Sequence, residues 1–197
     1  MIKRLFDIIF SLFGIFILSP LFLLIPILIK IEDNSTVFYR GTRIGKGGES
    51  FKILKFRTMV VNADKIGGPS TADDDSRITR TGRILRKYKL DEIPQLINVL
   101  KGEMSFVGPR PEVPFYVNMF TDEEKQILTV KPGITDWASL WDSDEGAILA
   151  GSPDPEKTYM EKIRPEKLRL QLQYVKEGSF WVDMTIILKT FFKLFKR

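Results

Sequence analysis

Cysteine and histidine are both absent from this chain of 197 residues. Their absence excludes disulfides, cysteine nucleophiles, zinc sites built from Cys and His, and Ser-His-Asp triads. An enzyme with this sequence would draw its acid, base, nucleophile and metal ligands mainly from Asp, Glu, Lys, Tyr, Ser and Thr. Any bound metal would be a hard cation held by oxygen atoms, and Mg²⁺ is the first candidate.

Acidic residues are fewer than basic ones, 25 against 30, so the net charge is +5. A basic protein favours anionic partners such as nucleic acid, anionic lipid or phosphorylated substrates. Nucleic acid is not expected here, because few aromatic residues lie between the basic ones and because the same chain carries a strong membrane segment. No feature of the sequence indicates an oligomeric state.

Charged residues are missing from a run of 22 residues, Ile8 to Ile29, which is long enough to cross a bilayer as a helix. Ser19-Pro20 lies at its middle. Pro20 has no N–H for the helix ladder, and Ser19 can bond to a freed carbonyl, so a break here is tolerable in lipid. A cleaved signal peptide fits poorly, because the run is too long and no cleavage site follows it.

Basic residues flank this run on both sides, and lysine and arginine prefer the cytoplasmic face of a membrane. The flanks contain Lys3 and Arg4 before the run, and Lys30, Arg40, Arg43 and Lys46 after it. Together with the central break, they favour a re-entrant helix-break-helix that enters and leaves by one face. A kinked helix that crosses the membrane once explains the same pattern.

After Lys30 the composition changes to that of a folded domain. Val37–Arg40 and Phe51–Phe56 predict two short strands, and the glycines of 45–48 predict a hairpin turn between them. Residues 65–76 predict a loop that contains Asp73-Asp74-Asp75. Three adjacent carboxylates can bind a metal, but they are more typical of a solvated loop.

Two further segments combine helical spacing with positive charge. Arginines recur every third residue at 77, 80, 83 and 86, which predicts a basic helical face, either solvated or able to bind phosphates. Residues 180–197 are amphipathic. Met184, Ile187, Leu188, Phe191 and Phe195 share one predicted face, and Lys189, Lys193, Lys196 and Arg197 gather on the other. Such a helix can lie in the headgroup layer or pack on a core.

Between these segments, the apolar residues after position 92 follow helical spacing up to Gly102, which is placed to end the helix. Asp91 occupies the N-cap region, and Pro94 falls in the first turn. Asp91-Glu92 would therefore stand at the positive end of a helix dipole. An ordinary helix cap explains this acidic pair as well as a catalytic role does.

Four motifs, in this order after the apolar segment, give the chain its resemblance to a family. They are FKILKFRTM at 51–59, LDEIPQL at 90–96, SFVGPRP at 105–111 and KPGIT at 131–135. Over nearly its whole length the chain resembles the bacterial sugar transferases known as monotopic phosphoglycosyl transferases. The resemblance and the patterns together predict an α+β fold, mainly helical with a small β-hairpin. Residues 1–30 would form the re-entrant helix, broken at Ser19-Pro20, and 31–197 a catalytic domain with amphipathic interfacial helices.

The resemblance also implies a reaction and a place in the cell. Asp91 of the Asp91-Glu92 pair would attack the β-phosphate of a UDP-sugar, UMP would leave, and polyprenyl phosphate would attack the aspartyl phosphosugar. The product would be a polyprenyl diphosphate sugar, the first membrane step of glycoconjugate synthesis. Mg²⁺ is required. The enzyme would sit in the bacterial inner membrane, among its lipids, with the active site on the cytoplasmic face.

Individual residues then receive expected roles. A carboxylate can act as a nucleophile at phosphorus, and Asp91 and Glu92 are the expected Mg²⁺ ligands. Lys55, Arg57 and Arg110 would supply positive charge for the phosphoryl oxygens. Arg86, five residues before the nucleophile, is expected to bind the polyprenyl phosphate or a lipid headgroup.

One departure from the family leaves the donor sugar open. Many members follow the GIT turn with G-x-A-Q-V-N-G-R, and Ser143 stands here where that Arg would be. Two other functions also remain open. One is a membrane-attached glycosyltransferase that releases UDP. The other is a non-catalytic basic protein held at anionic membranes, in which Asp91-Glu92 is only a cap.

Overall fold

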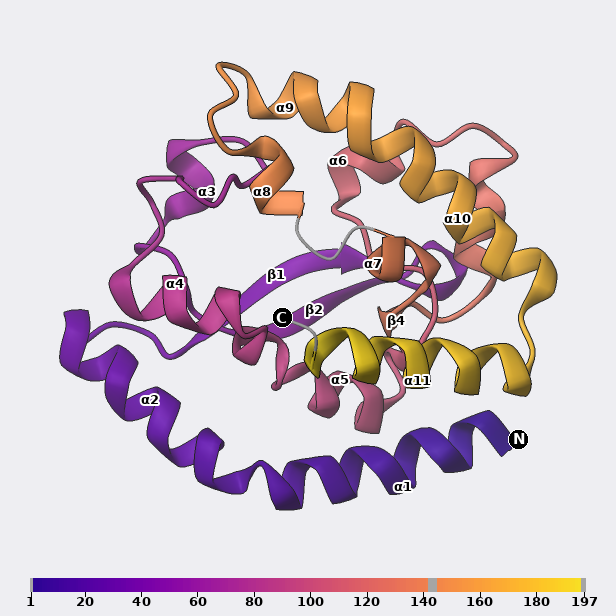
Figure 1. Cartoon of the computed structure of the whole chain (residues 1–197), viewed down its shortest axis with the longest axis horizontal. Helices are drawn as coiled ribbons and strands as arrows, with labels where there is room; N and C mark the ends of the chain where they lie inside the picture. Colours follow the sequence, from indigo (N-terminus) through magenta and orange to yellow (C-terminus); the bar gives the residue numbers. More distant parts are fainter. Residues whose placement is uncertain (1, 142–144, 196–197) are drawn as a thin grey trace.

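The computed structural model describes residues 2–141 and 145–195, with the side chains of residues 194 and 195 left out. Besides its helices it contains one β-hairpin and one pair of very short strands (Figure 1). The bounds of the main helices are α1 Ile2–Ile17, α2 Ser19–Asp33, α4 Arg80–Lys87, α5 Gln95–Lys101, α10 Arg164–Glu177 and α11 Phe180–Phe195. The shorter helices are α3 Ala63–Ile66, α6 Pro114–Val117, α7 Trp137–Trp141, α8 Glu145–Leu149 and α9 Pro155–Thr158.

Single turns complete the helical part. Three are 3-10 turns, Lys46–Gly48, Leu90–Glu92 and Glu124–Thr129, and one is a π turn, Tyr159–Ile163. The α+β class, mainly helical with a small hairpin, is therefore confirmed. The core is divided among several small clusters. One of them joins Ile25 and Ile29 of α2 to Phe56 and Leu85 of the domain.

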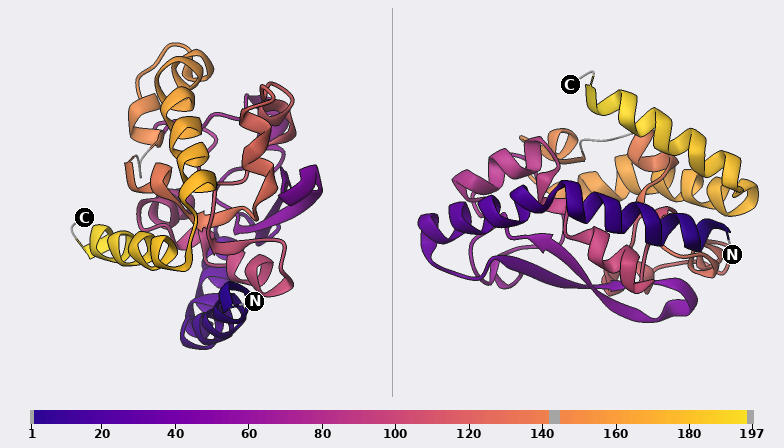
Figure 2. Two further views of the ribbon diagram at one scale, coloured as in Figure 1. Left: turned by 90° about the vertical axis from the view of Figure 1, so that its right-hand side faces the viewer. Right: turned by 90° about the horizontal axis from the view of Figure 1, so that it is seen from below.

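The predicted helix break is present. Helices α1 and α2 meet at 59° on either side of Leu18, and α2 begins with Ser19 and Pro20. Among the described residues no single helix is long and apolar enough to cross a bilayer, and only this bent pair meets the length and composition together. In Figure 2 the pair forms a bent rod along one side of the domain, and α11 projects beside it.

The outward side of the rod is apolar. Large side chains such as Phe16 and Leu23 are 78% and 72% exposed, whereas Asp7 and Ser11 of the same rod are buried. Exposed apolar area of this extent marks a surface that is covered by another phase or molecule. The polar residues of α1 face the protein instead, which reverses the arrangement of a soluble amphipathic helix.

The predicted hairpin is also present, with longer strands than expected. Strands β1 Phe38–Ile44 and β2 Ser50–Phe56 pair antiparallel, with Gly41 opposite Ile53. The turn between them contains Gly47 and Gly48, both with positive φ, a conformation that glycine adopts without a steric cost. The loop expected over 65–76 instead begins inside α3, which ends at Ile66.

The second strand pair was not predicted from the sequence. Strand β3 Ser105–Val107 pairs in parallel with β4 Gly133–Thr135, so the SFVGPRP and KPGIT motifs lie side by side. Gly108 and Gly133 make this approach possible. A Cβ atom on Gly133 would meet the Gly108 nitrogen at 2.1 Å, and one on Gly108 would meet the Lys131 carbonyl oxygen at 2.3 Å.

Helix α11 differs from the predicted amphipathic pattern in one respect. Its protein-facing side contains Asp183 and Ile186, which are 4% and 0% exposed, while Leu188 and Phe191 of the predicted apolar face are 58% and 54% exposed. Lys193 is not free on a cationic face, because its Nζ donates to the Leu140 carbonyl at 2.5 Å. The helix thus has apolar side chains on both sides, and it packs on the core while part of the predicted apolar face stays exposed. The predicted contributions of Phe195, Lys196 and Arg197 lie outside the described residues.

Candidate active site

Asp91 and Glu92 lie on the 3-10 turn Leu90–Glu92, between α4 and α5. Lys89 precedes the turn with φ of 56°, a left-handed conformation that redirects the chain at the end of α4. Helix α5 begins later than predicted, after Pro94, and its first turn has no side-chain cap. The interpretation of Asp91 as an ordinary N-cap is therefore wrong, and its carboxylate remains available for another role.

Glu92 is fully engaged by two cations. Lys55 on β2 donates to Oε1 at 2.7 Å, and Arg110 donates to Oε2 at 3.3 Å and also to Oε1. Burial opposes ionisation of Glu92, but Arg110 and Lys55 outweigh it and hold the pKa of this carboxyl well below its usual range. Glu92 therefore stays charged and fixed in place.

Asp91 is buried beside this cluster but is bonded differently. Its side chain is 8% exposed, the Lys55 Nζ atom is 4.0 Å from Oδ2, and within the described part of the chain it accepts no hydrogen bond. Burial raises the pKa of Asp91, and the charge of Glu92 adds to that rise, while Lys55, Arg86 and Arg110 oppose it. A carboxylate with unbonded oxygens next to three cations is poised to meet an anionic electrophile.

The two other predicted cations of the site are in place. Arg86 extends from α4 and donates to the Thr58 hydroxyl at 3.1 Å. Burial lowers the pKa of Arg86, whereas the charge of Asp91 acts in the opposite sense. Burial likewise lowers the pKa of Lys55, and the carboxylate of Glu92 opposes that effect. Lys55, Arg86 and Arg110 thus surround the acidic pair from three different elements.

Arg57 has other partners. Its guanidinium makes a paired contact with both carboxylate oxygens of Asp33, at 2.8 and 2.5 Å, and donates to the carbonyls of Thr36 and Met59. It joins the end of α2 to the end of the hairpin. The structure thus gives Arg57 a bracing position and does not commit it to the acidic pair, so its predicted role in phosphate binding has no support from these contacts.

The basic stripe predicted over 77–86 does not form one helical face. Arg77 precedes α4 and pairs with Asp75 at 2.7 Å, while Arg86 turns inward. Asp74 accepts the Gly151 N–H at 3.0 Å. The three adjacent aspartates therefore organise the loop around Arg77 and α8, and among the described residues no cluster of three acidic side chains could hold a metal.

Several residues that support the site were not identified from the sequence. Asn98 ties α5 to β2, since its Oδ1 accepts the Leu54 N–H at 2.9 Å and its Nδ2 donates to the Lys52 carbonyl at 2.8 Å. Asp136, fully buried, accepts the Arg110 N–H at 3.2 Å and the Ser139 N–H at 2.7 Å. An Asp before an apolar helical segment is a helix-start signal, so Asp136 could have been noticed.

A buried lysine lies on the far side of Arg110. Lys167 of α10 pairs with Glu112 at 2.8 Å and with Glu145 at 3.0 Å. Burial opposes its charge, but these two carboxylates raise the pKa of Lys167 well above its ordinary value. The carboxylate of Glu92 raises the pKa of Arg110, and the carboxylate of Glu145 adds to that rise. Ser143, the position that departs from the family pattern, lies outside the described residues.

Oxygen ligands for Mg²⁺ fit this site only in part. Asp91 has oxygens to offer, but Glu92 is already bonded to Lys55 and Arg110. Mg²⁺ is commonly bound by one or two carboxylates together with substrate phosphates rather than by a protein cage. The donor set therefore suits a metal that arrives with a diphosphate.

Comparisons with known proteins show the family of the chain. The family model described as bacterial sugar transferase matches residues 1–197. The chain is 37% identical over 192 residues to the UDP-N-acetylgalactosamine-undecaprenyl-phosphate N-acetylgalactosaminephosphotransferase of Aeromonas hydrophila, covering 96% of this chain and 42% of that protein. It is 36% identical over 203 residues to the exopolysaccharide production protein ExoY of Sinorhizobium fredii, covering 95% and 83%.

A third relative is the UDP-glucose:undecaprenyl-phosphate glucose-1-phosphate transferase of Escherichia coli, 35% identical over 205 residues, with 99% of this chain and 40% of that protein covered. The chain thus spans less than half the length of two of these relatives and most of the third. Two of them carry names with different sugars, N-acetylgalactosamine and glucose.

Proposed function

Because the chain belongs to the bacterial sugar transferase family, we propose that it is a phosphoglycosyl transferase that moves a sugar 1-phosphate from a UDP-sugar to undecaprenyl or another polyprenyl phosphate. The products are a polyprenyl diphosphate sugar and UMP. The names of the relatives support this donor and acceptor, and their different sugars are the reason why no particular sugar is assigned.

The observation that carries the proposal is the contrast within the acidic pair. Glu92 is neutralised by Lys55 and Arg110, whereas Asp91 is buried and keeps its carboxylate oxygens free of hydrogen bonds among the described residues. A purely structural pair would have both acids satisfied. One fixed acid and one free acid is the arrangement that a carboxylate nucleophile needs.

We propose the following reaction at these residues. An Asp91 oxygen attacks the β-phosphorus of the donor, the bond from that phosphorus to the bridging oxygen breaks, and UMP leaves with the electron pair. A phosphate oxygen of the polyprenyl phosphate then attacks the same phosphorus and releases Asp91. Lys55 and Arg110 stand where they can neutralise the phosphoryl oxygens, and Arg86 faces Asp91 from the α4 side, where the acceptor phosphate would enter.

Mg²⁺ is part of the proposal, with Asp91 as its ligand and Glu92 a ligand only if it leaves Arg110 or Lys55. When bound, the metal would offset the repulsion between the carboxylate and the diphosphate. The other contributions come from the residues of the chain. Glu92 positions Lys55 and Arg110, and burial excludes water from Asp91.

The α1–α2 rod is proposed to be a re-entrant membrane element of the inner membrane, with the active site at the cytoplasmic surface. The 59° bend, the exposed apolar side and the basic residues beyond both ends support this. Helix α11, with Trp181, Phe191 and Phe192 exposed, would lie against the same surface. Polyprenyl phosphate is a lipid, so the acceptor would reach the site from the membrane.

The function is tested by incubating the purified protein with a panel of UDP-sugars, polyprenyl phosphate and Mg²⁺. UMP should be released with at least one donor, and Asp91→Asn should release almost none. Release of UDP would instead show a glycosyltransferase that moves only the sugar. No nucleotide release with any donor would show a non-catalytic membrane protein.

Topology is tested separately with introduced cysteines, since the chain has none of its own. One cysteine replaces Ile2, the first residue of the rod, and another replaces Ser35 after its end. Both should be labelled only from the cytoplasmic side. Labelling of one from each side would establish a single-pass helix and overturn the re-entrant arrangement.

A further inference from the structure

The polar residues at the start of α1 face the protein, although this helix is the most apolar element of the chain. Arg4 and Asp7 lie one turn apart on α1, and Asp7 is 2% exposed. From the sequence, the charge at this end was interpreted as a signal for membrane orientation. In the structure, both side chains instead bond to elements that lead directly to the active site.

Arg4 contacts the far end of α5. Its two terminal nitrogens donate to the carbonyls of Val99 and Leu100, at 2.6 and 2.7 Å. The last carbonyls of a helix have no partner within it, and a cation there is favourable. Helix α5 has seven residues and is about 10 Å long. Its other end follows Glu92 after two residues, so α5 transmits a displacement at Arg4 to the acidic pair.

Asp7 contacts β3. Its Oδ1 atom accepts the Ser105 hydroxyl at 3.0 Å and the Phe106 N–H at 3.1 Å. Arg110 follows β3 after a segment that contains Gly108, and the close packing of Gly108 on Gly133 leaves this segment little slack. The position of β3 therefore sets where the Arg110 guanidinium lies.

These two paths meet at the contact between Arg110 and Glu92. We propose that Arg4 and Asp7 are positioning residues of the transfer reaction: from one rigid helix they fix α5 and β3 relative to each other, and so hold the Asp91-Glu92 pair against Arg110. The proposal rests on the proposed function. It makes the membrane rod a part of the catalytic framework as well as an anchor.

The size of the expected effect follows from geometry. A misplacement of about 1 Å caused by a distant substitution can cost about 10²-fold in rate. Loss of either contact should therefore lower kcat by roughly tenfold to a hundredfold. KM for the donor should change by less than about threefold, because no group that would touch the donor has been removed.

The first experiment compares conservative and disruptive variants of the full chain in lipid nanodiscs. Asp7→Asn keeps the Oδ1 acceptor and Arg4→Lys keeps the orienting charge, whereas Asp7→Ala and Arg4→Met remove the contacts. We expect Asp7→Asn to retain about a third or more of kcat while Asp7→Ala loses about tenfold. Arg169→Met is the matched control, since Arg169 makes an exposed pair with Glu166. An Asp7→Asn enzyme as poor as Asp7→Ala would overturn the proposal.

A double-mutant cycle separates positioning from general destabilisation. If Asp7 acts through Arg110, Asp7→Ala should cost less than about twofold in an Arg110→Met background, because coupled residues are not additive. Equal losses in both backgrounds would contradict the proposal. Ser105→Ala removes one of the two hydrogen bonds that the Asp7 Oδ1 atom accepts. If Asp7→Ala does not fold, Ser105→Ala replaces it in the double-mutant cycle.

Amide hydrogen exchange tests the same idea without turnover. Asp7→Ala should increase exchange in the peptide that covers residues 105–110, and Arg4→Met in the peptide that covers 90–101, with smaller changes elsewhere. Unchanged exchange in these peptides would overturn the proposal. An inactive wild-type protein would refute the proposed function and not the positioning contacts. An active wild-type protein in which the losses from Asp7→Ala and Arg110→Met simply add would refute only the positioning role.

Discussion

Two arginine–carboxylate pairs in this chain have the same chemistry and different surroundings. Arg57 pairs with Asp33 at the junction of α2 and the hairpin, and its remaining donors are used by the carbonyls of Thr36 and Met59. Arg110 pairs with Glu92, next to Asp91, which lies 4.0 Å from Lys55 and accepts no hydrogen bond from the described residues. In the first region the charged groups of Arg57 and Asp33 are bonded to each other and to the backbone. In the second, Asp91 has no hydrogen-bond donor in the described part of the chain, and this difference favours a chemical role for it.

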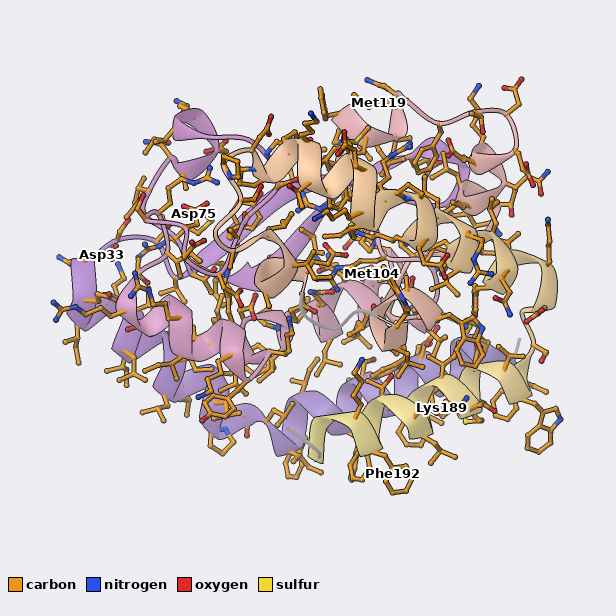
Figure 3. All side chains as sticks on the ribbon, turned by 45° about the horizontal axis from the view of Figure 1, so that its top comes forward. Asp33, Asp75, Met104, Met119, Lys189 and Phe192 are labelled. Carbon is orange, nitrogen blue, oxygen red and sulfur yellow. The ribbon has the colours of Figure 1, made fainter. Side chains whose placement is uncertain are left out.

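The two regions also differ in where they lie. Asp33 is at the end of the rod, while Met104, which directly precedes β3, is fully buried near the middle of the molecule (Figure 3). Arg57 bonds to Asp33 and to backbone carbonyls and not to the acidic pair, so its loss should affect stability more than rate. The comparison therefore predicts losses of stability in one region and losses of rate in the other.

The sharpest contrast is between two aspartates. Asp91→Asn is nearly isosteric, so the fold should survive, but turnover should fall by about 10³-fold or more because an amide is a very poor nucleophile. Asp33→Asn should keep turnover within about threefold, since it removes only the charge of a brace. UMP release measures both. A robustly active Asp91→Asn enzyme, with deamidation back to Asp excluded by mass, would refute the covalent mechanism.

The arginines should separate in the same way. Arg110→Met should lower kcat by about 10²-fold, the cost of removing a group that stabilises developing charge. Arg57→Met leaves Asp33 without its bonded partner and should cost about 2–3 kcal/mol of stability, with turnover per folded molecule preserved. Activity and thermal unfolding by tryptophan fluorescence give the two readouts. If Arg57→Met raised the donor KM without lowering Tm, the role in phosphate binding expected from the sequence would be restored.

A smaller effect is expected at the outward side of α11. Phe191 and Phe192 are 54% and 62% exposed there. Replacing both with Ser should weaken binding to vesicles of anionic lipid by about tenfold, because apolar area is no longer buried in the membrane. Met119→Ser is the control, since Met119 is exposed at the opposite side of the molecule (Figure 3). If the double variant lost thermal stability as well as vesicle binding, the two rings would be part of the packed core and not of a membrane-binding surface.

The smallest expected effect is a shift in pH dependence. Burial raises the pKa of Asp91, and Lys55 lowers it in turn. A nucleophilic carboxylate must be ionised, so kcat/KM should fall as pH drops through this pKa. Lys55→Met removes the opposing cation, which raises the pKa of Asp91 further and should move the acid limb to higher pH. If the acid limb of the kcat/KM profile moved to lower pH, or did not move, a group other than Asp91 would control it.

The motifs and the family resemblance named residues from separate segments, most of which the structure brings close together. LDEIPQL puts Asp91 and Glu92 on one turn, and the structure brings Lys55, Arg86 and Arg110 to that pair as expected. The bend at Ser19-Pro20 and the hairpin were predicted from local patterns, since a proline or a run of glycines acts on its own neighbours. Their outcome did not depend on distant contacts.

The parts that the sequence did not predict depend on contacts between distant residues. Arg57 follows Lys55 by two residues and was grouped with it, but β2 ends at Phe56 and Arg57 turns to Asp33, which no local pattern indicates. The strands β3 and β4 have three residues each, too few for a periodic signal. The spacing of α11 left a headgroup-layer helix and a core-packing helix both open, because its inner side is identified only by its tertiary partners.

The central claim is that Asp91 forms a covalent bond to the phosphosugar. It is tested most directly by giving the wild-type protein a UDP-sugar that it uses and Mg²⁺, without polyprenyl phosphate, and analysing the quenched protein by mass spectrometry. The account predicts release of at most about one UMP per active site and a gain equal to one phosphosugar, located on the peptide that contains Asp91. A wild-type enzyme that releases no UMP until polyprenyl phosphate is added, together with an Asp91→Asn enzyme that turns over at a similar rate, would contradict it.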